Sequence, residues 1–279
     1  MTELTRFLIK CRMTGLVSNQ MLLKIIKISL KSDNLEEETV QMMEKELEFE
    51  DFTQFLLLLR RPIEFEIKAI NYLDREYPQR LRTIYNPPAL LFFEGNIDLL
   101  KTECVGIIGS RKATNYSFRC ISALVPHLVN RYTIVSGLAE GADSMANKEA
   151  LVYGKTIAVL GSSLEQAFPV KNRYLQQAIA KNGLLITEYP IGNRIEPWHF
   201  PQRNRIIAGL SQKLIVTEAK ERSGSMITVD LALENGREVY ALPGPFDSEL
   251  SRGCNSLIKQ GATPLIAFLK NISSFKLTN

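Results

Sequence analysis

From Cys104 onward, short apolar runs rich in β-branched residues alternate with longer stretches whose apolar residues recur at helical spacing. We predict strands over Cys104–Ile108, Tyr132–Val135, Thr156–Leu160, Leu184–Thr187, Lys213–Thr217 and Glu238–Leu242. The intervening helices are predicted over residues 116–129, 143–153, 172–181, 202–208 and 225–234. Because the strands are continuously apolar, both of their faces are expected to be buried. The pattern therefore predicts an α/β fold in which helices cover both faces of a parallel sheet.

The first 60 residues have a different pattern, with no proline and a single glycine, Gly15. Their apolar residues recur at helical spacing, which indicates a bundle of short helices. Pro78 and Pro87-Pro88 then indicate an extended connector, followed by a strand within residues 89–96. We therefore predict a small all-helical domain over residues 1–70, a connector over 71–100 and a sheet domain over 101–279.

The composition is that of an ordinary globular protein. Of the 279 residues, 45% are hydrophobic and 23% are charged, and no apolar run approaches the roughly 18 residues that span a bilayer. The four cysteines form no CxxC pair, which is typical of reduced thiols in a cytoplasmic protein. With only two histidines and no clustered ligands, the sequence predicts no metal site. We also expect no cofactor and, because no apolar run is long enough to span a bilayer, no membrane contact.

Charge is divided unevenly along the chain, whose net charge is +4. Residues 1–70 hold 10 basic and 12 acidic residues, and nine of these acids fall within Lys31–Asp51. The acid-rich segment is interpreted as a solvated helical surface, and a contact for a basic partner is the alternative. The remaining 24 basic and 18 acidic residues leave the larger part at +6, which permits an anionic ligand.

Small and polar residues follow the carboxyl ends of the predicted strands, where a parallel sheet carries its ligand site. The candidate contacts are Gly109, Ser110, Arg111, Gly137, Lys171, Ser223, Gly224 and Ser225. Small residues allow close approach to the backbone, and free N–H groups at helix starts bind anions. For Ser223–Ser225, ordinary helix capping is the alternative.

The densest basic and aromatic stretch is Arg194–Arg205, which combines three arginines with Trp198 and Phe200. Arginines beside aromatic rings are typical of single-stranded nucleic-acid sites, where charges meet phosphates and rings meet bases. The ligand contacts selected from this stretch are Arg203, Asn204 and Arg205. We interpret the two aromatic side chains as core residues, with base stacking as the alternative.

Nucleotide motifs and catalytic groups are weakly represented. Gly106-Ile-Ile-Gly109 is not GxGxxG, and Ser136-Gly137 stands where a ribose-binding acid is usual, so NAD binding is disfavoured. Asp143 and Glu188 lie at strand ends, but no metal-ligand companion accompanies them. They are therefore interpreted as turn and cap residues, and we predict no catalytic residue.

Several blocks carry a family resemblance: Gly109–Thr114, Ser136–Ala139, Thr156–Gly161, Phe200–Ser211, Ser223–Thr228 and Gly253–Ala262. Over about residues 70–265, the chain resembles the DNA-processing protein A family, also called DprA or Smf. The Phe200–Ser211 and Ser223–Thr228 blocks are the most specific. The resemblance implies an extended Rossmann-like sheet behind a small helical domain that is similar to a sterile alpha motif (SAM-like). It also implies the short form of the family, without a winged-helix domain.

The resemblance further implies a function without catalysis. Members of this family bind single-stranded DNA, protect incoming DNA and load the RecA recombinase during natural transformation. The implied partners are thus single-stranded DNA, RecA and a second copy of the chain, in the cytoplasm. For the homodimer, the predicted contacts are Leu257, Ile258 and Leu265, in an apolar C-terminal stretch that also holds Phe268 and Leu269.

Two positions depart from the family's usual pattern, with Glu140 in place of a basic residue and Asn147 in place of a histidine. The alternative function is a Rossmann-like enzyme that hydrolyses nucleotide N-glycosidic bonds, with Glu188 or Glu218 as its catalytic group. Enzymes of that class carry a PGGxGT-type motif, and Ser223-Gly-Ser225 does not resemble it. The sequence therefore favours DNA binding.

Overall fold

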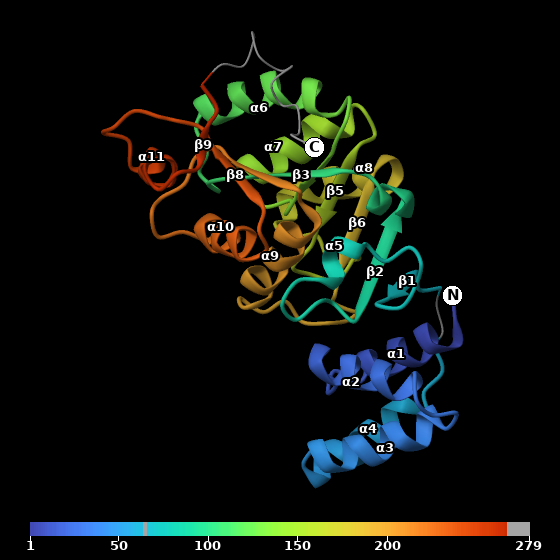
Figure 1. The fold of residues 1–279 in the computed structure, drawn as a ribbon. Helices are drawn as coiled ribbons and strands as arrows, with labels where there is room; N and C mark the ends of the chain where they lie inside the picture. Colours follow the sequence, from blue (N-terminus) through green and yellow to red (C-terminus); the bar gives the residue numbers. More distant parts are fainter. Residues whose placement is uncertain (64–65, 267–279) are drawn as a thin grey trace.

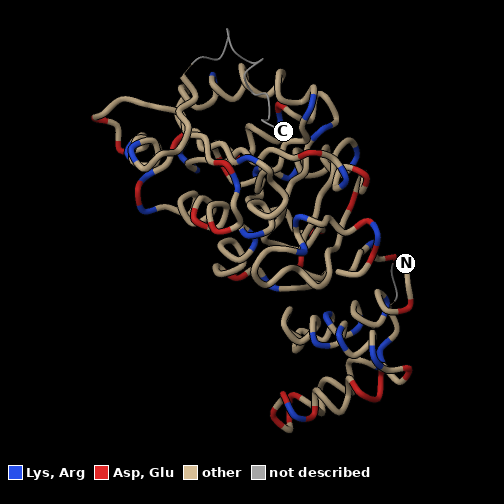
Figure 2. Tube along the Cα trace, viewed as in Figure 1, with Lys and Arg blue, Asp and Glu red and all other residues tan. Residues whose placement is uncertain are grey.

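The computed structural model describes residues 1–63 and 66–266, in which a helical unit lies next to a helix-covered sheet (Figure 1). The helical unit comprises α1 (Glu3–Met13), α2 (Asn19–Ser29), α3 (Leu35–Glu46) and α4 (Phe49–Leu59). Thr2 and Ser18 begin the first two helices, because their side chains accept hydrogen bonds from free N–H groups of the first turn. Acidic residues gather along α3 and the start of α4 (Figure 2).

Among the described residues, the sheet has nine strands in the order β1-β2-β6-β5-β4-β3-β7-β8-β9. They are β1 (Ala69–Asn71), β2 (Leu90–Gly95), β3 (Cys104–Ile108), β4 (Thr133–Ser136), β5 (Thr156–Val159), β6 (Leu184–Thr187), β7 (Lys213–Val216), β8 (Glu238–Ala241) and β9 (Thr263–Pro264). Neighbours from β6 to β9 pair in parallel, whereas β2 runs antiparallel to β6 and β1 antiparallel to β2. The predicted α/β fold is confirmed, and β3 to β8 match the predicted strands to within one residue. The predicted strand after the connector is β2, while β1 and β9 are too short to give a periodic signal.

The helices of the sheet domain are α5 (Gln79–Arg82), α6 (Asn115–Leu128), α7 (Ala142–Leu151), α8 (Arg173–Asn182), α9 (His199–Leu210), α10 (Gly224–Glu234) and α11 (Glu249–Lys259). Short 3₁₀ helices, η1 (Ile97–Lys101) and η2 (Val170–Asn172), precede β3 and α8. Helix α9 begins three residues before its predicted start, because its first turn accommodates Pro201. None of the helices within residues 1–63 and 66–266 is both long and apolar enough to cross a membrane.

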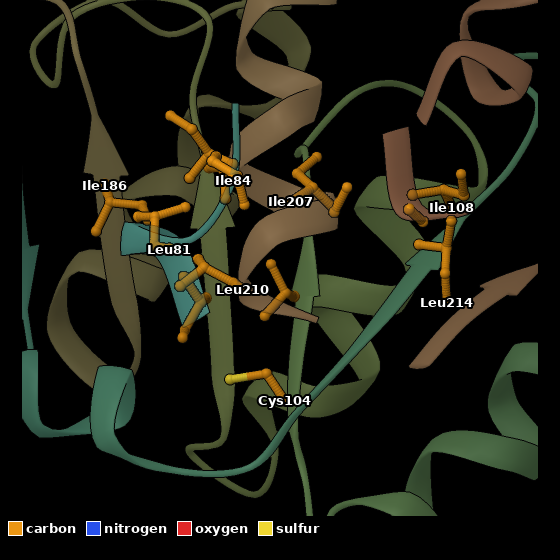
Figure 3. Close-up of a cluster of buried hydrophobic side chains, with 14 of the residues drawn as sticks. Leu81, Ile84, Cys104, Ile108, Ile186, Ile207, Leu210 and Leu214 are labelled. Atoms are coloured by element: carbon orange, nitrogen blue, oxygen red, sulfur yellow. The ribbon is translucent and has the colours of Figure 1, made fainter. Parts of the chain in front are cut away.

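Two helical layers cover the sheet. On one face, α5, α9 and α10 pack against strand residues such as Ile108 and Leu214 (Figure 3). On the other face, α6 and α7 pack against Ile107 and Ile215. Adjacent residues of one strand thus point into opposite layers, as the pleat requires. The continuous apolar runs in the sequence reflect this double burial.

The helical unit shares a hydrophobic core with the start of the sheet. Leu8 and Phe55 of the helices belong to one buried cluster with Leu90 and Phe92 of β2. Polar contacts reinforce this docking, because Asn19 accepts a hydrogen bond of 2.7 Å from the N–H of Ala89 and donates one of 2.9 Å to the carbonyl of Pro87. The helices are therefore packed against the sheet domain through β1 and β2.

Candidate nucleic-acid interface

A cavity of about 390 Å³ opens at the carboxyl edge of the sheet, beyond the ends of β3 and β7. The predicted residues that line it are Gly109, Ser110, Arg111, Arg203, Asn204, Ser223, Gly224 and Ser225. Because β4, β3 and β7 are parallel neighbours, the loops that follow them meet at one edge. The structure thus brings together most of the predicted contacts, whereas Gly137, Lys171 and Arg205 do not line the cavity.

The start of α10 forms one wall. Ser223 occupies the N-cap position but makes no side-chain cap; its hydroxyl donates to the carbonyl of Lys220 instead. The Ser225 hydroxyl donates to the carbonyl of Gly109 across the cavity wall, at 2.9 Å. The side-chain capping alternative for Ser223 is therefore wrong. The wall presents a helix N-terminus, where free N–H groups and the helix dipole favour an anion.

Arg203 forms the floor of the cavity. Its side chain is buried, and Nη1 donates a hydrogen bond of 2.6 Å to the carbonyl of Val159. A Cβ at Gly137 would lie 1.8 Å from that Nη1, so only glycine fits beneath the guanidinium. Burial lowers the pKa of Arg203 and raises that of the neighbouring Asp143, although their opposite charges partly offset the two shifts. Gly137 does not line the cavity, but its lack of a side chain leaves the space that the Arg203 guanidinium occupies.

Exposed groups lie at the mouth. The Arg111 guanidinium is 5.8 Å from the ring centroid of Phe200, which in turn is 5.0 Å from that of Phe168. Lys220 also lines the cavity and forms an exposed ion pair with Glu249, at 2.8 Å. The predicted contacts omit Lys220, although the sequence points to the Lys220–Arg222 loop, beyond the carboxyl end of β7, as the alternative place for the site. The mouth thus combines exposed cations with flat aromatic surfaces.

The core interpretation of the two aromatic residues is wrong for Trp198, whose side chain is 56% exposed. Phe200 is half-buried and lines the cavity. Helix α9 begins at His199, so Trp198 lies just outside it and Phe200 in its first turn. The helix start therefore directs Phe200 into the cavity, where its ring is available to a ligand.

Arg205 differs most from its prediction. Its side chain is 8% exposed, and its Nη2 lies 2.6 Å from Oε1 of Glu188. Arg12 of α1 reaches the same place and donates from Nε to the backbone carbonyl of Glu188, at 3.4 Å. Residues two apart on a helix point about 200° apart, so Arg203 faces the cavity while Arg205 faces the helical unit. We therefore correct the predicted DNA contact at Arg205 to a buried ion pair.

The family follows from comparison with known proteins, because residues 68–276 match the family of DNA recombination-mediator protein A. The chain belongs to this family. It is 46% identical over 195 residues to DNA processing protein DprA of Streptococcus pneumoniae, across 70% of this chain and 69% of that one. It is 38% identical over 263 residues to DNA processing protein DprA of Bacillus subtilis, across 90% and 89%. The resemblance read from the sequence is confirmed.

Two solved structures of DprA proteins are also similar. The S. pneumoniae protein superposes with a TM-score of 0.85 at 34% identity, over 99% of each chain. DNA processing protein A of Helicobacter pylori, whose structure concerns its single-stranded DNA binding mode, gives a TM-score of 0.70 at 32% identity. That match covers 76% of this chain and 96% of the other.

In this DprA-family chain, the departure at Glu140 changes the surroundings of Lys171. The Lys171 ammonium lies 2.6 Å from Oε2 of Glu140, and both side chains are substantially exposed. The carboxylate offsets the positive charge that the sequence assigns to DNA contact. An exposed pair of this kind contributes only about 0–1 kcal/mol to stability. Lys171 therefore lies outside the cavity as half of a neutral pair.

The departure at Asn147 lies inside the protein. Its Oδ1 accepts from the N–H of Leu138 at 3.2 Å, and its Nδ2 donates to Thr156 Oγ1 at 2.9 Å. Leu138 has a left-handed φ of 52°, a conformation that a leucine adopts only when its surroundings hold it there. Asn147 thus ties the loop that carries Gly137 to β5.

The carboxylates proposed for a hydrolase lie outside the cavity lining. Glu188 pairs with Arg205, and Glu218 accepts hydrogen bonds of 2.7 and 2.8 Å from the N–H and hydroxyl of Thr114. Within residues 1–63 and 66–266, no group of three His, Cys, Asp or Glu side chains is placed to hold a metal ion. The acid with access to the cavity is Asp143, which accepts from the N–H of Gly137 at 3.2 Å.

The residues predicted for a dimer differ in exposure. Leu257 is only 3% exposed and packs into the core of its own domain, and Ile258 packs against that core while partly exposed. Leu265 is half-buried against the layer formed by α6 and α7. Phe268 and Leu269 lie outside the described residues. Ile258 and Leu265 thus retain surface for a contact, whereas Leu257 is buried in the core of its own domain.

Proposed function

We propose that this protein binds single-stranded DNA in the cavity at the carboxyl edge of the sheet and acts as a recombination mediator. The observation that carries the proposal is the convergence of Arg111, Arg203 and the α10 N-terminus on one cavity. Each of these groups favours a phosphate. Membership of the recombination-mediator family and the similarity to the H. pylori DprA structure support the same ligand.

The form of the site favours a single strand over a duplex. Arg203 is buried at the cavity floor, so a phosphate must enter the cavity to approach it. A flexible strand can direct one phosphate inward and turn a base onto Phe200, whereas a duplex holds its phosphates on a rigid surface. Stacking on an aromatic ring contributes about 1–3 kcal/mol per base. The contacts reach phosphate and ring faces, so little sequence preference is expected.

We further propose that the bound strand is protected and delivered to RecA during natural transformation, in the cytoplasm. In this proposal the protein acts as a homodimer, without a cofactor and without catalysis. The support is the family to which the chain belongs. For the dimer, the partly exposed Ile258 and Leu265 are the proposed contacts.

The test is a titration of labelled single-stranded and duplex DNA followed by fluorescence anisotropy, at several stated salt concentrations. We expect the parent to prefer the single strand. Arg111→Ala should bind about fivefold more weakly at 0.1 M salt and reduce the slope of log K against log salt by about 0.7, the value of one phosphate contact. Arg119→Ala removes an exposed arginine of α6 outside the cavity and is the matched control. Equal affinities of the parent, Arg111→Ala and Arg119→Ala would show that the site lies elsewhere.

A further inference from the structure

A second basic hollow lies at the opposite edge of the sheet. This amino-edge groove, of about 390 Å³, is lined by the segment around α5, by residues that lead into β3 and by Leu210 at the end of α9. Its lining contains four cations and one carboxylate: Arg75, Arg80, Arg82, Lys101 and Glu76. Because Thr102 precedes β3 and Leu210 ends α9, the groove and the DNA cavity lie at opposite ends of the same elements.

Arg80 of this groove lies close to a second arginine, Arg237, which is not part of the groove lining. Arg80 donates from Nη1 to the carbonyl of Leu210 at 3.3 Å, and Arg237 donates from Nη2 to the carbonyl of Gly209 at 3.2 Å. These bonds satisfy carbonyl groups in the last turn of α9, as cations at a helix C-terminus do. The pKa of Arg237 is lowered by burial and by the nearby charge of Arg80. The arrangement therefore brings like charges together.

That charge is only partly balanced. Throughout the described part of the chain, neither Arg80 nor Arg237 forms an ion pair with a carboxylate. The carboxylate of Glu103 is close enough to Arg80 to interact with its charge, but its ion pair is with Arg131, at 3.0 Å. Arg80, which lines the groove, uses Nη1 for its bond to Leu210, and a guanidinium offers five N–H donors in all. Donors and charge thus remain for an anion.

The neighbouring surface favours nucleic acid over an acidic protein segment. Tyr85 lies three residues beyond Arg82, and its side chain is 86% exposed. Arg82 itself is fixed by hydrogen bonds of 3.0 and 2.8 Å to the carbonyls of Tyr72 and Asp74. Tyr85 is not part of the groove lining, but it is close to Arg82 along the chain and offers an exposed ring; single strands combine such stacking surfaces with phosphate contacts.

Helix α9 sets the distance between the two basic sites. Phe200 lies in its first turn at the cavity and Leu210 at its last residue in the groove. Ten residues of α-helix rise roughly 15 Å, which a few nucleotides of an extended strand can span. One bound strand can therefore reach both places.

We propose that the amino-edge groove is a second phosphate-binding site for the single-stranded DNA held in the cavity. This inference rests on the proposed function and extends it, because it makes the DNA site bipartite along α9. A short strand occupies the cavity alone, and a longer one also contacts the groove.

The experiment compares a thymidine oligonucleotide of about 4 nucleotides with one of about 16, the range of single-strand site sizes. The variant is Arg75→Gln with Lys101→Gln, because both side chains are exposed and neither caps α9. Lys101 also forms an exposed ion pair with Asp98, at 2.7 Å, whose removal should change stability little. The control is Lys27→Gln with Lys31→Gln, which removes the same charge from exposed positions of the helical unit. Affinity is measured by anisotropy at a series of salt concentrations.

For the long strand, we expect the groove variant to bind about fivefold more weakly at 0.1 M salt for each phosphate contact that is lost. The slope of log K against log salt should fall by up to roughly 1.4, the value of two phosphate contacts. Its affinity for the short strand should equal that of the parent, and the control should match the parent for both strands. Parental affinity and salt slope for the long strand would overturn the groove assignment and leave the cavity assignment intact. If, in addition, the variant bound a poly-glutamate peptide more weakly than the parent does, the groove would be a protein-binding surface. Failure of the parent to bind either strand would overturn the proposed function, and this inference with it.

Discussion

Arg111 and Arg205 both belong to the predicted site, but their surroundings give them opposite sensitivities to substitution. Arg205→Ala leaves the buried Glu188 carboxylate without its partner, so we expect the free energy of unfolding to fall by about 3–5 kcal/mol. Arg111 is exposed, and Arg111→Ala should change that free energy by less than about 0.5 kcal/mol. Urea unfolding followed by circular dichroism measures both. If Arg205→Ala kept the parent's stability while losing affinity for single-stranded DNA, Arg205 would be a direct contact and our correction would be wrong.

At the scale of elements, the loop between β4 and α7 determines the shape of the cavity floor. Three side chains hold it: Asp143 and Asn147 of α7 accept from the N–H groups of Gly137 and Leu138, and Asn172 donates to the carbonyl of Leu138 at 2.9 Å. This loop places Gly137 under the Arg203 guanidinium. The geometry of the site therefore depends on side chains outside the cavity lining as well as on those that face the ligand.

Asn147→Ala should loosen this loop. The substitution leaves the buried N–H of Leu138 without an acceptor, and we expect the free energy of unfolding to fall by about 1–3 kcal/mol. Single-stranded DNA binding should weaken as well, because the loop would no longer hold Gly137 in place against the Arg203 guanidinium. The control is Asn182→Ala, which removes an exposed asparagine of α8 whose side chain donates to the carbonyl of Ala178. Unfolding and anisotropy titrations measure the two effects; a destabilised variant with parental DNA affinity would show that the loop does not position the site.

At the scale of the whole molecule, the helical unit is part of the structure that supports the sheet. Its residues share a hydrophobic core with Leu90 and Phe92 of β2, and Arg12 reaches the backbone of Glu188 beside the buried ion pair. The division at residues 70 and 100 remains a prediction from the sequence pattern. The shared core shows that removing the helices would expose apolar surface of the sheet domain.

We therefore expect a fragment that begins at Glu66 to be less stable than the sheet domain of the full chain. Exposure of Leu90 and Phe92 alone should cost about 3–6 kcal/mol, at about 1.5–3 kcal/mol for each large apolar side chain. Thermal unfolding of the fragment and the full chain, followed by circular dichroism, measures the difference. Equal unfolding temperatures would mean that the core shared by helices and sheet contributes no stability.

The sequence by itself determined the α/β class, the strands β3 to β8 and the edge at which we propose that the ligand binds. These features depend on the local sequence pattern, because a β-branched apolar run followed by a loop of small and polar residues indicates both a buried strand and the loop at its carboxyl end. The same local signal places Gly109, Ser110 and Ser223 at one cavity. The family blocks lie in these loops, in β5 and in α9, α10 and α11, where the local sequence pattern is distinctive, which is why the family could also be identified.

Only the tertiary structure decided which cations face that cavity. Arg203 and Arg205 are both arginines of α9, but the way α9 packs on the sheet directs Arg203 toward the cavity and Arg205 toward Glu188. Lys171 follows a strand as predicted, yet Glu140 lies beside it and offsets its charge. Arg12 meets Glu188 across 176 positions of the chain. Such pairings depend on packing between distant segments, and no local periodicity encodes them, so they required the folded structure.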